Sequence, residues 1–326
     1  MPTESERISP GHPFVAAADV GGTAIKGALL GAGGSVKRSR QIATVAAEGP
    51  RAVVGRVVTL LRELAADVGE PLAVGVAVPG VVDEERGVAV LGANLGWQNT
   101  PVRDMLQPEF SGPVTVMHDV RAGGLAEARL GAARGSSEAL FVALGTGVAA
   151  ALFRNGEVHR GAHGLAGEIG HVQVEPDGPR CGCGGRGCLE TVASAAAIAR
   201  RYRELSGEAE ASAATVVERV ESGDPLAART WSHAVRRLGW VLALCQSVLD
   251  VDIAVLGGGL AGAGDYLLDP LRAAIRASLT FQQPPELAVS ELGGQAGCLG
   301  AGLAAWDSIG GADVAADERT AWKASC

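Results

Sequence analysis

Aromatic residues and positive charge are both scarce in this chain of 326 residues. Phe, Trp and Tyr make up 4% of the residues, so small aliphatic side chains must fill most of the core. Lys and Arg number 28 against 36 Asp and Glu, which gives a formal net charge of −8. Because phosphate-backbone binding needs clustered Lys and Arg, this balance argues against nucleic acid as a partner. No apolar run approaches the roughly 20 residues of a membrane-spanning helix, so we expect no membrane partner.

The N-terminal segment also lacks the apolar core of a signal peptide, so export is not expected. Unpaired thiols at metal-type spacing fit a reducing compartment, and we predict a cytoplasmic protein. Residues 1–13 and 311–326 are expected to be flexible tails. The 47 glycines and 47% hydrophobic residues indicate an α/β protein with many tight turns, and the length allows two domains.

The segment 161–191 holds three of the six cysteines within eight residues. His171 precedes Cys181 by ten positions, and Cys183 and Cys188 complete the pattern H-x9-C-x-C-x4-C. One imidazole and three thiolates are a donor set of closed, tetrahedral zinc sites. Cys181 and Cys183 are separated by one residue, which is too short for an unstrained disulfide. A glycine-rich turn with incidental thiols is the alternative, but clustered Cys beside a His favours metal.

Two carboxylates, Glu168 and Glu190, lie at the ends of the same segment. Carboxylate oxygens accept hydrogen bonds and hydroxyl groups donate them, so this pair suits a polyol. If one nitrogen of His171 binds zinc, the other is held in place to meet a ligand. The alternative is that both acids are ordinary solvated side chains.

Two glycine-threonine turns connect predicted strands. The first turn, Gly21-Gly22-Thr23, follows Asp19 and joins the strands predicted at 14–20 and 24–30; the second is Gly145-Thr146-Gly147, between strands at 139–144 and 148–153. Backbone N–H groups in such turns can hold phosphate oxygens, with Thr23 and Lys26 as additional donors, although many glycine turns bind nothing. The repeat predicts two related halves with a cleft between them.

Periodicity predicts the remaining elements: helices at 50–68, 194–205, 213–221, 225–249, 266–278 and 296–309, and strands at 72–78, 88–91, 114–117, 253–256 and 287–292. Cys245 falls on the apolar face of its helix and is expected to be buried. Asp119 follows a strand, at the edge where α/β sheets collect ligands, and it could equally cap the next helix. Gly257, Gly258 and Gly259 could let backbone approach a flat ligand such as a purine, or could simply form a turn.

Five motifs together resemble the ROK family of sugar kinases and sugar-responsive repressors: DVGGT at 19–23, LGTG at 144–147, GEIGH at 167–171, CGCGGRGCLE at 181–190 and LGGGL at 256–260. The resemblance covers nearly the whole chain and implies an actin-like ATPase fold with two domains around a cleft. We expect an N-terminal domain at 14–120, completed by the helix at 298–310. A larger C-terminal domain at 121–297 would carry the zinc loop 167–191.

The resemblance also implies roles for individual residues. Asp119 matches the catalytic base; the sugar ligands are expected to be Asn94, His118, Asp119, Glu168, His171 and Glu190. The structural zinc would be held by His171, Cys181, Cys183 and Cys188, and ATP with Mg²⁺ by Asp19, Gly21, Gly22, Thr23, Lys26, Gly145, Thr146, Gly147, Gly257, Gly258 and Gly259. The family usually reads Asn-Asp-Ala-Asn-Ala around the base, whereas this chain has His118 and Arg121 at the two asparagine positions. Arg121 could pair with Asp119, pair with another acid or face solvent.

The predicted function is that of an ATP-dependent sugar kinase, a glucokinase that phosphorylates O6 of glucose. Alternative substrates are N-acetylglucosamine, N-acetylmannosamine, mannose or a cyclitol, and polyphosphate is an alternative donor. A sugar-binding protein without catalysis, or a repressor, is a further alternative. A repressor would need a DNA-binding module before the first strand, and 13 residues precede it. By resemblance, the protein is expected to form a homodimer.

Overall fold

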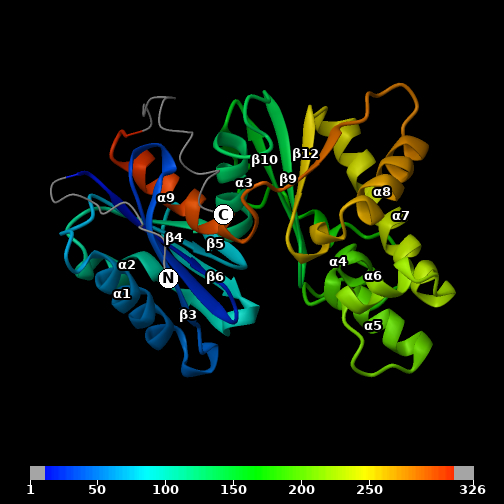
Figure 1. Ribbon diagram of the computed structural model, residues 1–326, viewed down its shortest axis with the longest axis horizontal. Coiled ribbons are helices and arrows are strands. Elements are labelled where there is room, and N and C mark those ends of the chain that lie inside the picture. The colour runs from blue at the N-terminus through cyan, green and yellow to red at the C-terminus, as the bar shows by residue number, and fades with distance from the viewer. Residues whose placement is uncertain (1–11, 312–326) are drawn as a thin grey trace. The chain divides into compact units, whose positions relative to one another are not determined.

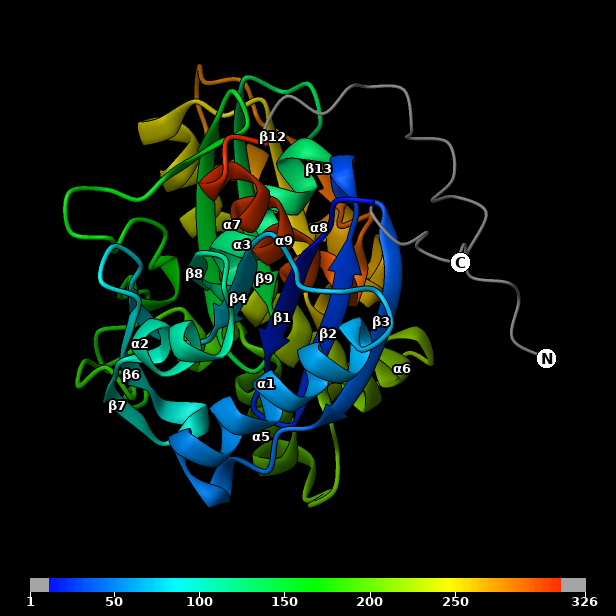
Figure 2. The ribbon, with the colours of Figure 1, turned by 90° about the vertical axis from the view of Figure 1, so that its left-hand side faces the viewer.

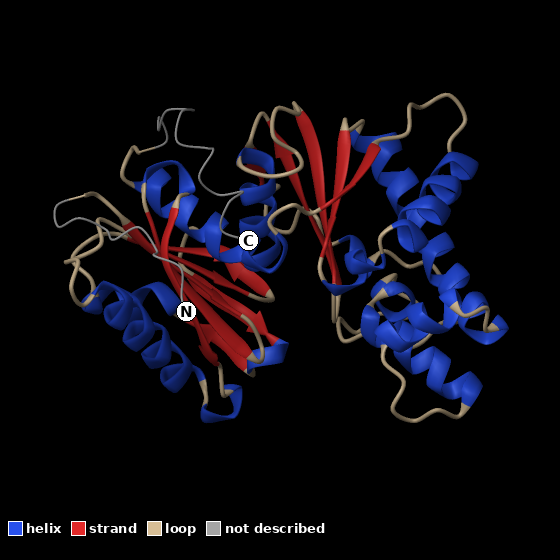
Figure 3. Cartoon of the chain, in the orientation of Figure 1, coloured by secondary structure: helices blue, strands red, loops and turns tan. Residues whose placement is uncertain are grey.

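The structure is a computed structural model that describes residues 12–311 (Figures 1 and 3). The chain divides into two compact units. Unit 1 comprises Met1–Ala126 and Gly294–Cys326, and unit 2 comprises Glu127–Gly293. The tails expected at both ends of the chain lie almost entirely outside the described residues. Within residues 12–311, no helix combines the length and the apolarity needed to cross a lipid bilayer.

The main sheet of unit 1 has the order β3-β2-β1-β4-β8. Its strands are β1 (Val15–Val20), β2 (Ala24–Leu30), β3 (Val36–Ala43), β4 (Val74–Val78) and β8 (Val114–His118). Strands β1, β2 and β3 pair antiparallel, whereas β1, β4 and β8 run parallel. Helix α1 (Pro50–Ala65) packs on the side of β2 and β3, as Figure 2 shows, and α9 (Ala296–Ser308) packs on β1 and β4. A smaller sheet contains β5 (Val81–Asp83), β6 (Val88–Gly92) and β7 (Trp97–Thr100), followed by α2 (Val102–Leu106).

Glycines allow α9 to lie very close to this sheet. A Cβ on Gly75 of β4 would lie 1.8 Å from the carbonyl oxygen of Ala301. On the helix side, a Cβ on Gly300 would lie 1.7 Å from the carbonyl oxygen of Ala122 in α3 (Asp119–Arg129). No larger side chain fits at either position without moving the backbone, so these glycines fix the distance between α9 and its neighbours.

Unit 2 repeats the topology of unit 1. Its sheet has the order β11-β10-β9-β12-β13, in which β9, β10 and β11 pair antiparallel and β9, β12 and β13 run parallel. The strands are β9 (Glu138–Leu144), β10 (Val148–Arg154), β11 (Glu157–His159), β12 (Ile253–Gly257) and β13 (Glu286–Val289). The helices of this unit after β11 are α4 (Glu190–Ala193), α5 (Ala195–Ser206), α6 (Ala213–Glu221), α7 (Pro225–Leu249) and α8 (Asp265–Ser278). The internal repeat predicted from the two glycine-threonine turns is confirmed at the level of strand order.

Each unit has its own apolar core, built from small and branched side chains as the scarcity of aromatics predicts. All the predicted elements are present, and α6 and α7 have the predicted bounds. Three predictions were too long by two or more residues: α1 ends at Ala65, β4 begins at Val74 and β13 ends at Val289. Cys245 is half-buried rather than fully buried, and burial raises the pKa of its thiol to about 11.

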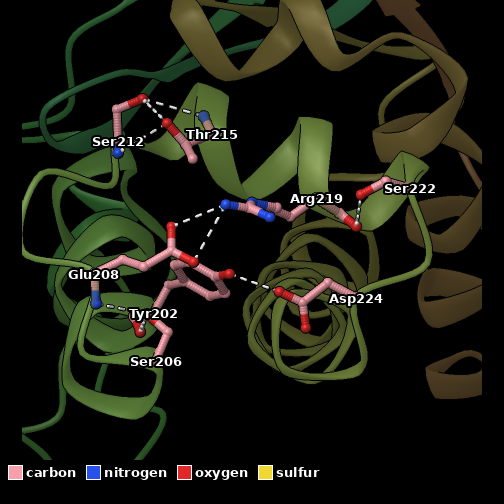
Figure 4. Close-up of polar contacts among 8 residues, drawn as sticks. All are labelled: Tyr202, Ser206, Glu208, Ser212, Thr215, Arg219, Ser222 and Asp224. Carbon is pink, nitrogen blue, oxygen red and sulfur yellow. Dashed lines mark hydrogen bonds and ion pairs between the residues drawn. The ribbon is translucent and has the colours of Figure 1, made fainter.

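A polar cluster joins α5, α6 and α7 (Figure 4). The hydroxyl of Tyr202, whose side chain is almost fully buried, donates to Oδ2 of Asp224 at 2.6 Å. The other oxygen of Asp224 accepts from the backbone N–H of Leu226 at 2.8 Å and so caps α7. Around this pair, Arg219 contacts Glu208 and a capping box closes the start of α6.

The substitution Tyr202→Phe should therefore lower the melting temperature by roughly 2–4 °C, because the part-buried carboxylate of Asp224 loses its donor with little change in side-chain volume. Calorimetry of the purified protein would measure the shift. The matched control is Ser222→Ala, which removes an exposed hydrogen bond to the carbonyl of Arg219 and should change the melting temperature by about 1 °C or less. Equal shifts in the two variants would contradict a stabilising role of the hydrogen bond between Tyr202 and Asp224.

Candidate functional site

The first glycine turn joins β1 to β2 and is held by two hydrogen bonds from Thr44. The N–H of Gly21 donates to the carbonyl of Ala24 at 2.9 Å. The hydroxyl of Thr44 donates to the carbonyl of Gly21 at 2.6 Å, and its N–H donates to the carbonyl of Thr23 at 3.0 Å. Gly22 and Thr23 are exposed, so the tip of the turn is open to a ligand. No local pattern in the sequence indicates the role of Thr44, which comes directly after β3 and far from the turn in the chain.

Asp19 and Lys26 are cross-strand neighbours on β1 and β2. Burial raises the pKa of Asp19, and the charge of Lys26 opposes this rise. The ammonium group of Lys26 donates to the carbonyl of Gly294 at 2.5 Å, so it is directed toward the chain before α9. Gly297 packs directly against the Asp19 carboxylate, since a Cβ there would lie 2.8 Å from its Cγ. Asp19 is thus a part-buried carboxylate with Lys26 as its cross-strand neighbour, and such a carboxylate suits a cation.

Asp119 is the first residue of α3 and comes directly after β8. Its Oδ1 accepts from the N–H of Val120 at 2.7 Å, and Nε2 of His118 lies 3.2 Å from the same oxygen. Burial, together with the negative charge of Asp19, raises the pKa of Asp119 to about 7. Its side chain is 35% exposed, and this contact with solvent limits how far the pKa can rise. The capping and functional interpretations of Asp119 are therefore compatible.

Asn94 lies in a short 3-10 turn, Ala93–Leu95, beside the first glycine turn. A Cβ on Gly22 would lie 3.5 Å from the Cβ of Asn94. Unit 1 thus groups two sets of predicted site residues, the first glycine turn with Asn94 and the acidic pair Asp19 and Asp119.

The second glycine turn, between β9 and β10, contacts Glu190 at the start of α4. Oε2 of Glu190 accepts from the N–H of Val148 at 3.1 Å, and a Cβ on Gly147 would lie 2.4 Å from that oxygen. The N–H of Ala195 donates to the carbonyl of Gly145 at 2.9 Å. A predicted sugar ligand and a predicted phosphate turn are therefore in direct contact within unit 2.

The glycines after β12 lie beside the same turn. A Cβ on Gly258, which has a φ of +83°, would lie 2.4 Å from the carbonyl oxygen of Leu144. A Cβ on Gly257 would contact the ring of Phe141, so both glycines are required by packing. Gly259 has no atom within 4 Å of such a Cβ and is the position at which a ligand could approach.

His171, Cys181, Cys183 and Cys188 form the predicted metal cluster, and their four ligand atoms all lie within 4.8 Å of one another. Nδ1 of His171 is 3.6 Å from Sγ of Cys181, and the sulfurs of Cys183 and Cys188 are 3.7 Å apart. Tetrahedral zinc with Zn–S bonds of about 2.3 Å requires sulfurs about 3.8 Å apart. The donor set and its spacing therefore fit a closed four-ligand site.

The two nitrogens of the His171 imidazole face different groups. Nδ1 faces the thiols, whereas Nε2 lies 3.7 Å from Oε2 of Glu168. Both side chains are about one-third exposed, so they can reach a ligand. Glu175 ties the same loop to α7, since its Oε1 lies 2.5 Å from Nε2 of His233. This arrangement supports the expectation that one nitrogen of His171 binds metal and the other meets a polyol.

Of the alternatives predicted for Arg121, solvent exposure is wrong and pairing with another acid is confirmed. Arg121 is buried, and its Nε donates to Oε1 of Glu84 at 2.7 Å. Glu84 and Thr44 are polar residues near the predicted site whose contacts the sequence did not indicate.

The family to which the chain belongs follows from its match to a family model. A model described as the ROK family matches residues 15–307. The chain belongs to the ROK family. The glucokinase of Halalkalibacterium halodurans is 32% identical to it over 304 residues, which are 87% of this chain and 92% of that protein. The N-acetylmannosamine kinase of Escherichia coli is 31% identical over 300 residues, with coverage of 90% and 98%.

Among solved structures, this ROK chain is similar to a ROK family glucokinase from Streptomyces griseus in complex with glucose and AMPPNP. The TM-score is 0.80 at 27% sequence identity, and the match covers 90% of this chain and 99% of that one. The chain therefore has the α/β fold of ROK sugar kinases.

Proposed function

We propose that this protein is an ATP-dependent sugar kinase that transfers the γ-phosphoryl group of ATP to O6 of glucose. The observation that carries the proposal is the family match over residues 15–307. We assign Asp119 as the base from the resemblance of its motif to that of the family. The similarity to glucokinases, one of them bound to glucose and an ATP analogue, supports both substrates.

In the proposed reaction, Asn94, Glu168, His171 and Glu190 bind ring hydroxyls and hold O6 toward the phosphate. Asp119 accepts the O6 proton as the new O–P bond forms, and the bond between the γ-phosphorus and the bridging oxygen breaks to release ADP. The two glycine turns hold phosphate oxygens through backbone N–H groups, and Gly259 lies on the adenosine side. The carboxylate of Glu190 links the sugar-binding side of unit 2 to its phosphate turn, since it accepts from Val148.

Two metals complete the proposal. Zinc, held by His171, Cys181, Cys183 and Cys188, is structural because protein atoms supply all four ligands. Asp19 would hold the magnesium that accompanies ATP, and that ion supplies neutralising charge to the phosphate oxygens. The part-buried carboxylate of Asp19, whose pKa burial raises, fits this role.

We also propose that the repeated strand order represents the actin-like ATPase fold, with an N-terminal domain at 14–120 completed by 298–310 and a C-terminal domain at 121–297. The equal topology of the two sheets supports this assignment. A cytoplasmic homodimer is the proposed state of the protein.

The direct test is a coupled assay of ADP release with glucose, N-acetylglucosamine, N-acetylmannosamine, mannose and a cyclitol as acceptors. ATP and polyphosphate would be compared as donors, and product would be identified by mass and NMR. We expect the highest kcat/KM with ATP and glucose, with phosphate on O6. Activity restricted to N-acetylmannosamine would instead favour the second candidate, a kinase for that sugar, which the 31% identity to such a kinase supports.

The pH dependence of kcat/KM provides a separate prediction. The base must be ionised to accept a proton, and the pKa of Asp119 is raised to about 7. We therefore expect kcat/KM for glucose to be maximal above this pH and to fall about tenfold per pH unit below it. A profile that stays flat down to pH 5, with the protein still folded, would contradict Asp119 as the base.

A further inference from the structure

His118 and Arg121 occupy the positions at which this chain departs from the family pattern around the base, and both are buried. His118 is 6% exposed and Arg121 is 2% exposed. A histidine buried to this extent has little surface left to contact a sugar. Its contacts are instead with the base and with Glu84, so its role is better sought within the protein.

Glu84, which directly follows β5, connects these residues. Its Oε1 accepts from the backbone N–H of His118 at 3.0 Å and from Nε of Arg121 at 2.7 Å. Only 8% of the Glu84 side chain is exposed, so the carboxylate and the guanidinium form a buried ion pair. One oxygen of Glu84 thereby holds both the backbone of His118, which precedes the base, and the side chain of Arg121, which follows it by two residues.

The imidazole of His118 extends this connection to Asp119. Nε2 of His118 lies 3.2 Å from Oδ1 of Asp119, whose second contact is the N–H of Val120. At 3.2 Å the pair is a close N···O contact, and because an ionised carboxylate only accepts hydrogen bonds, the contact is favourable only with the imidazole proton on Nε2. Nδ1 of His118 is then unprotonated, and it has no hydrogen-bond partner among the described residues.

We propose that Glu84, Arg121 and His118 are positioning residues that hold Oδ1 of Asp119 and leave Oδ2 to meet the acceptor hydroxyl. The proposal rests on the proposed kinase function. It replaces the expected sugar contact of His118 by a contact with the base. Fixing one oxygen restricts rotation of the carboxyl group, and correct orientation of a base is worth orders of magnitude in rate.

The charges around the pair favour a neutral imidazole. Burial lowers the pKa of His118 to about 4, the charge of Arg121 acts in the same direction, and Glu84 opposes both. A neutral donor orients Asp119 without placing a full positive charge beside it. An imidazolium there would stabilise the carboxylate and weaken it as a base.

The test compares His118→Ala with His118→Gln, whose amide nitrogen reaches approximately the place of Nε2. We expect His118→Ala to lower kcat by about 10- to 100-fold, with the KM for glucose and for ATP within about twofold of wild type. We expect the acid limb of the pH profile to move to higher pH, because the carboxylate loses a donor. His118→Gln should restore both kcat and the acid limb. A rise in the KM for glucose at constant kcat, an unmoved acid limb, or no rescue by Gln would each overturn the proposal.

A second pair of variants examines Glu84 and Arg121. Removing one partner of a buried ion pair destabilises a protein strongly, so single variants can fail to fold. The double variant Glu84→Gln/Arg121→Gln removes both charges together and should fold, as a thermal melt would verify. It should reproduce the kcat loss of His118→Ala at nearly constant KM, and wild-type kcat in the folded double variant would overturn the role of this pair.

A readout without substrate separates this proposal from the kinase function. In protein labelled with ¹³C at aspartate carboxyls, the Asp119 signal is the one missing from Asp119→Asn. The titration of Asp119 should move to higher pH in His118→Ala and return to the wild-type pH in His118→Gln. Asp19 and Arg121, whose charges also act on Asp119, are unchanged in all of these samples. If this shift occurs but no sugar is phosphorylated, the kinase function fails while the contact stands. If the titration does not move, the positioning role fails whatever the activity.

Discussion

The substitution Asp119→Asn is expected to lower kcat by about 10²- to 10⁴-fold while glucose still binds with nearly the wild-type Kd. Asparagine has almost the same shape and can still accept from the N–H of Val120, which Oδ1 does now at 2.7 Å. It cannot take the proton from O6, so the loss falls on the transfer step. Single-turnover kinetics would measure the transfer rate, and calorimetry would measure glucose binding.

The matched control for this experiment is Asp104→Asn. Asp104 is an exposed acid in the first turn of α2, in the same unit, and no proposed ligand contacts it. The Asp104→Asn substitution removes one negative charge from unit 1 and should leave kcat within about twofold of the wild-type value. Near-normal turnover in Asp119→Asn would remove Asp119 as the base, whereas an equal loss in Asp104→Asn would show that the assay reports net charge.

The parts of the site that sequence predicted best are local in the chain. His171 and the three cysteines lie within 18 residues, from 171 to 188, and their spacing alone predicts that they meet. Periodicity predicted the bounds of α6 and α7, and local caps define the same bounds in the structure. Ser212 closes a capping box before α6, and Asp224 caps α7 immediately before Pro225. Short-range signals fix these elements whatever the rest of the chain does.

Contacts between distant parts of the chain could not be predicted. Glu84 and Arg121 are separated by 37 positions and meet only because β5 lies next to the end of β8. Thr44 reaches the turn at Gly21 because β3 returns along β2. Either partner taken alone resembles an ordinary polar surface residue. The pairing depends on sheet register, which a single sequence specifies weakly.

Edge strand β3 was missed for a different reason. Its sequence, VKRSRQIA, lacks apolar alternation, and its residues are partly or fully exposed. Basic side chains on an edge strand discourage pairing with another molecule, and they also hide the strand from a hydrophobicity pattern. The opposite error occurred at β13, because buried Leu292 extends the apolar pattern beyond the strand. Its N–H is held by the carboxylate of Glu127 instead of by a neighbouring strand.

The other large effect is expected from Cys183→Ser. Serine does not provide the thiolate that a three-cysteine, one-histidine zinc site needs, so we expect bound zinc to fall from about one per chain to almost none. Without the metal, Nδ1 of His171 loses its anchor and Nε2 is no longer held near Glu168, 3.7 Å away. The KM for glucose should rise about 10- to 100-fold, because loss of an orienting contact has effects of that size. Elemental analysis would measure zinc, and steady-state kinetics would measure KM.

Cys245→Ser is the matched control, because Cys245 is a half-buried thiol on α7 outside the cluster. It should keep both zinc and the KM for glucose. Removal of zinc from the wild-type protein with a chelator should produce the same rise in the KM for glucose. Added zinc should reverse that rise. Wild-type protein that binds no stoichiometric zinc would contradict the metal assignment. Zinc loss without a change in KM would separate the metal from the sugar site, and His171 would then be a zinc ligand with no role in binding the sugar.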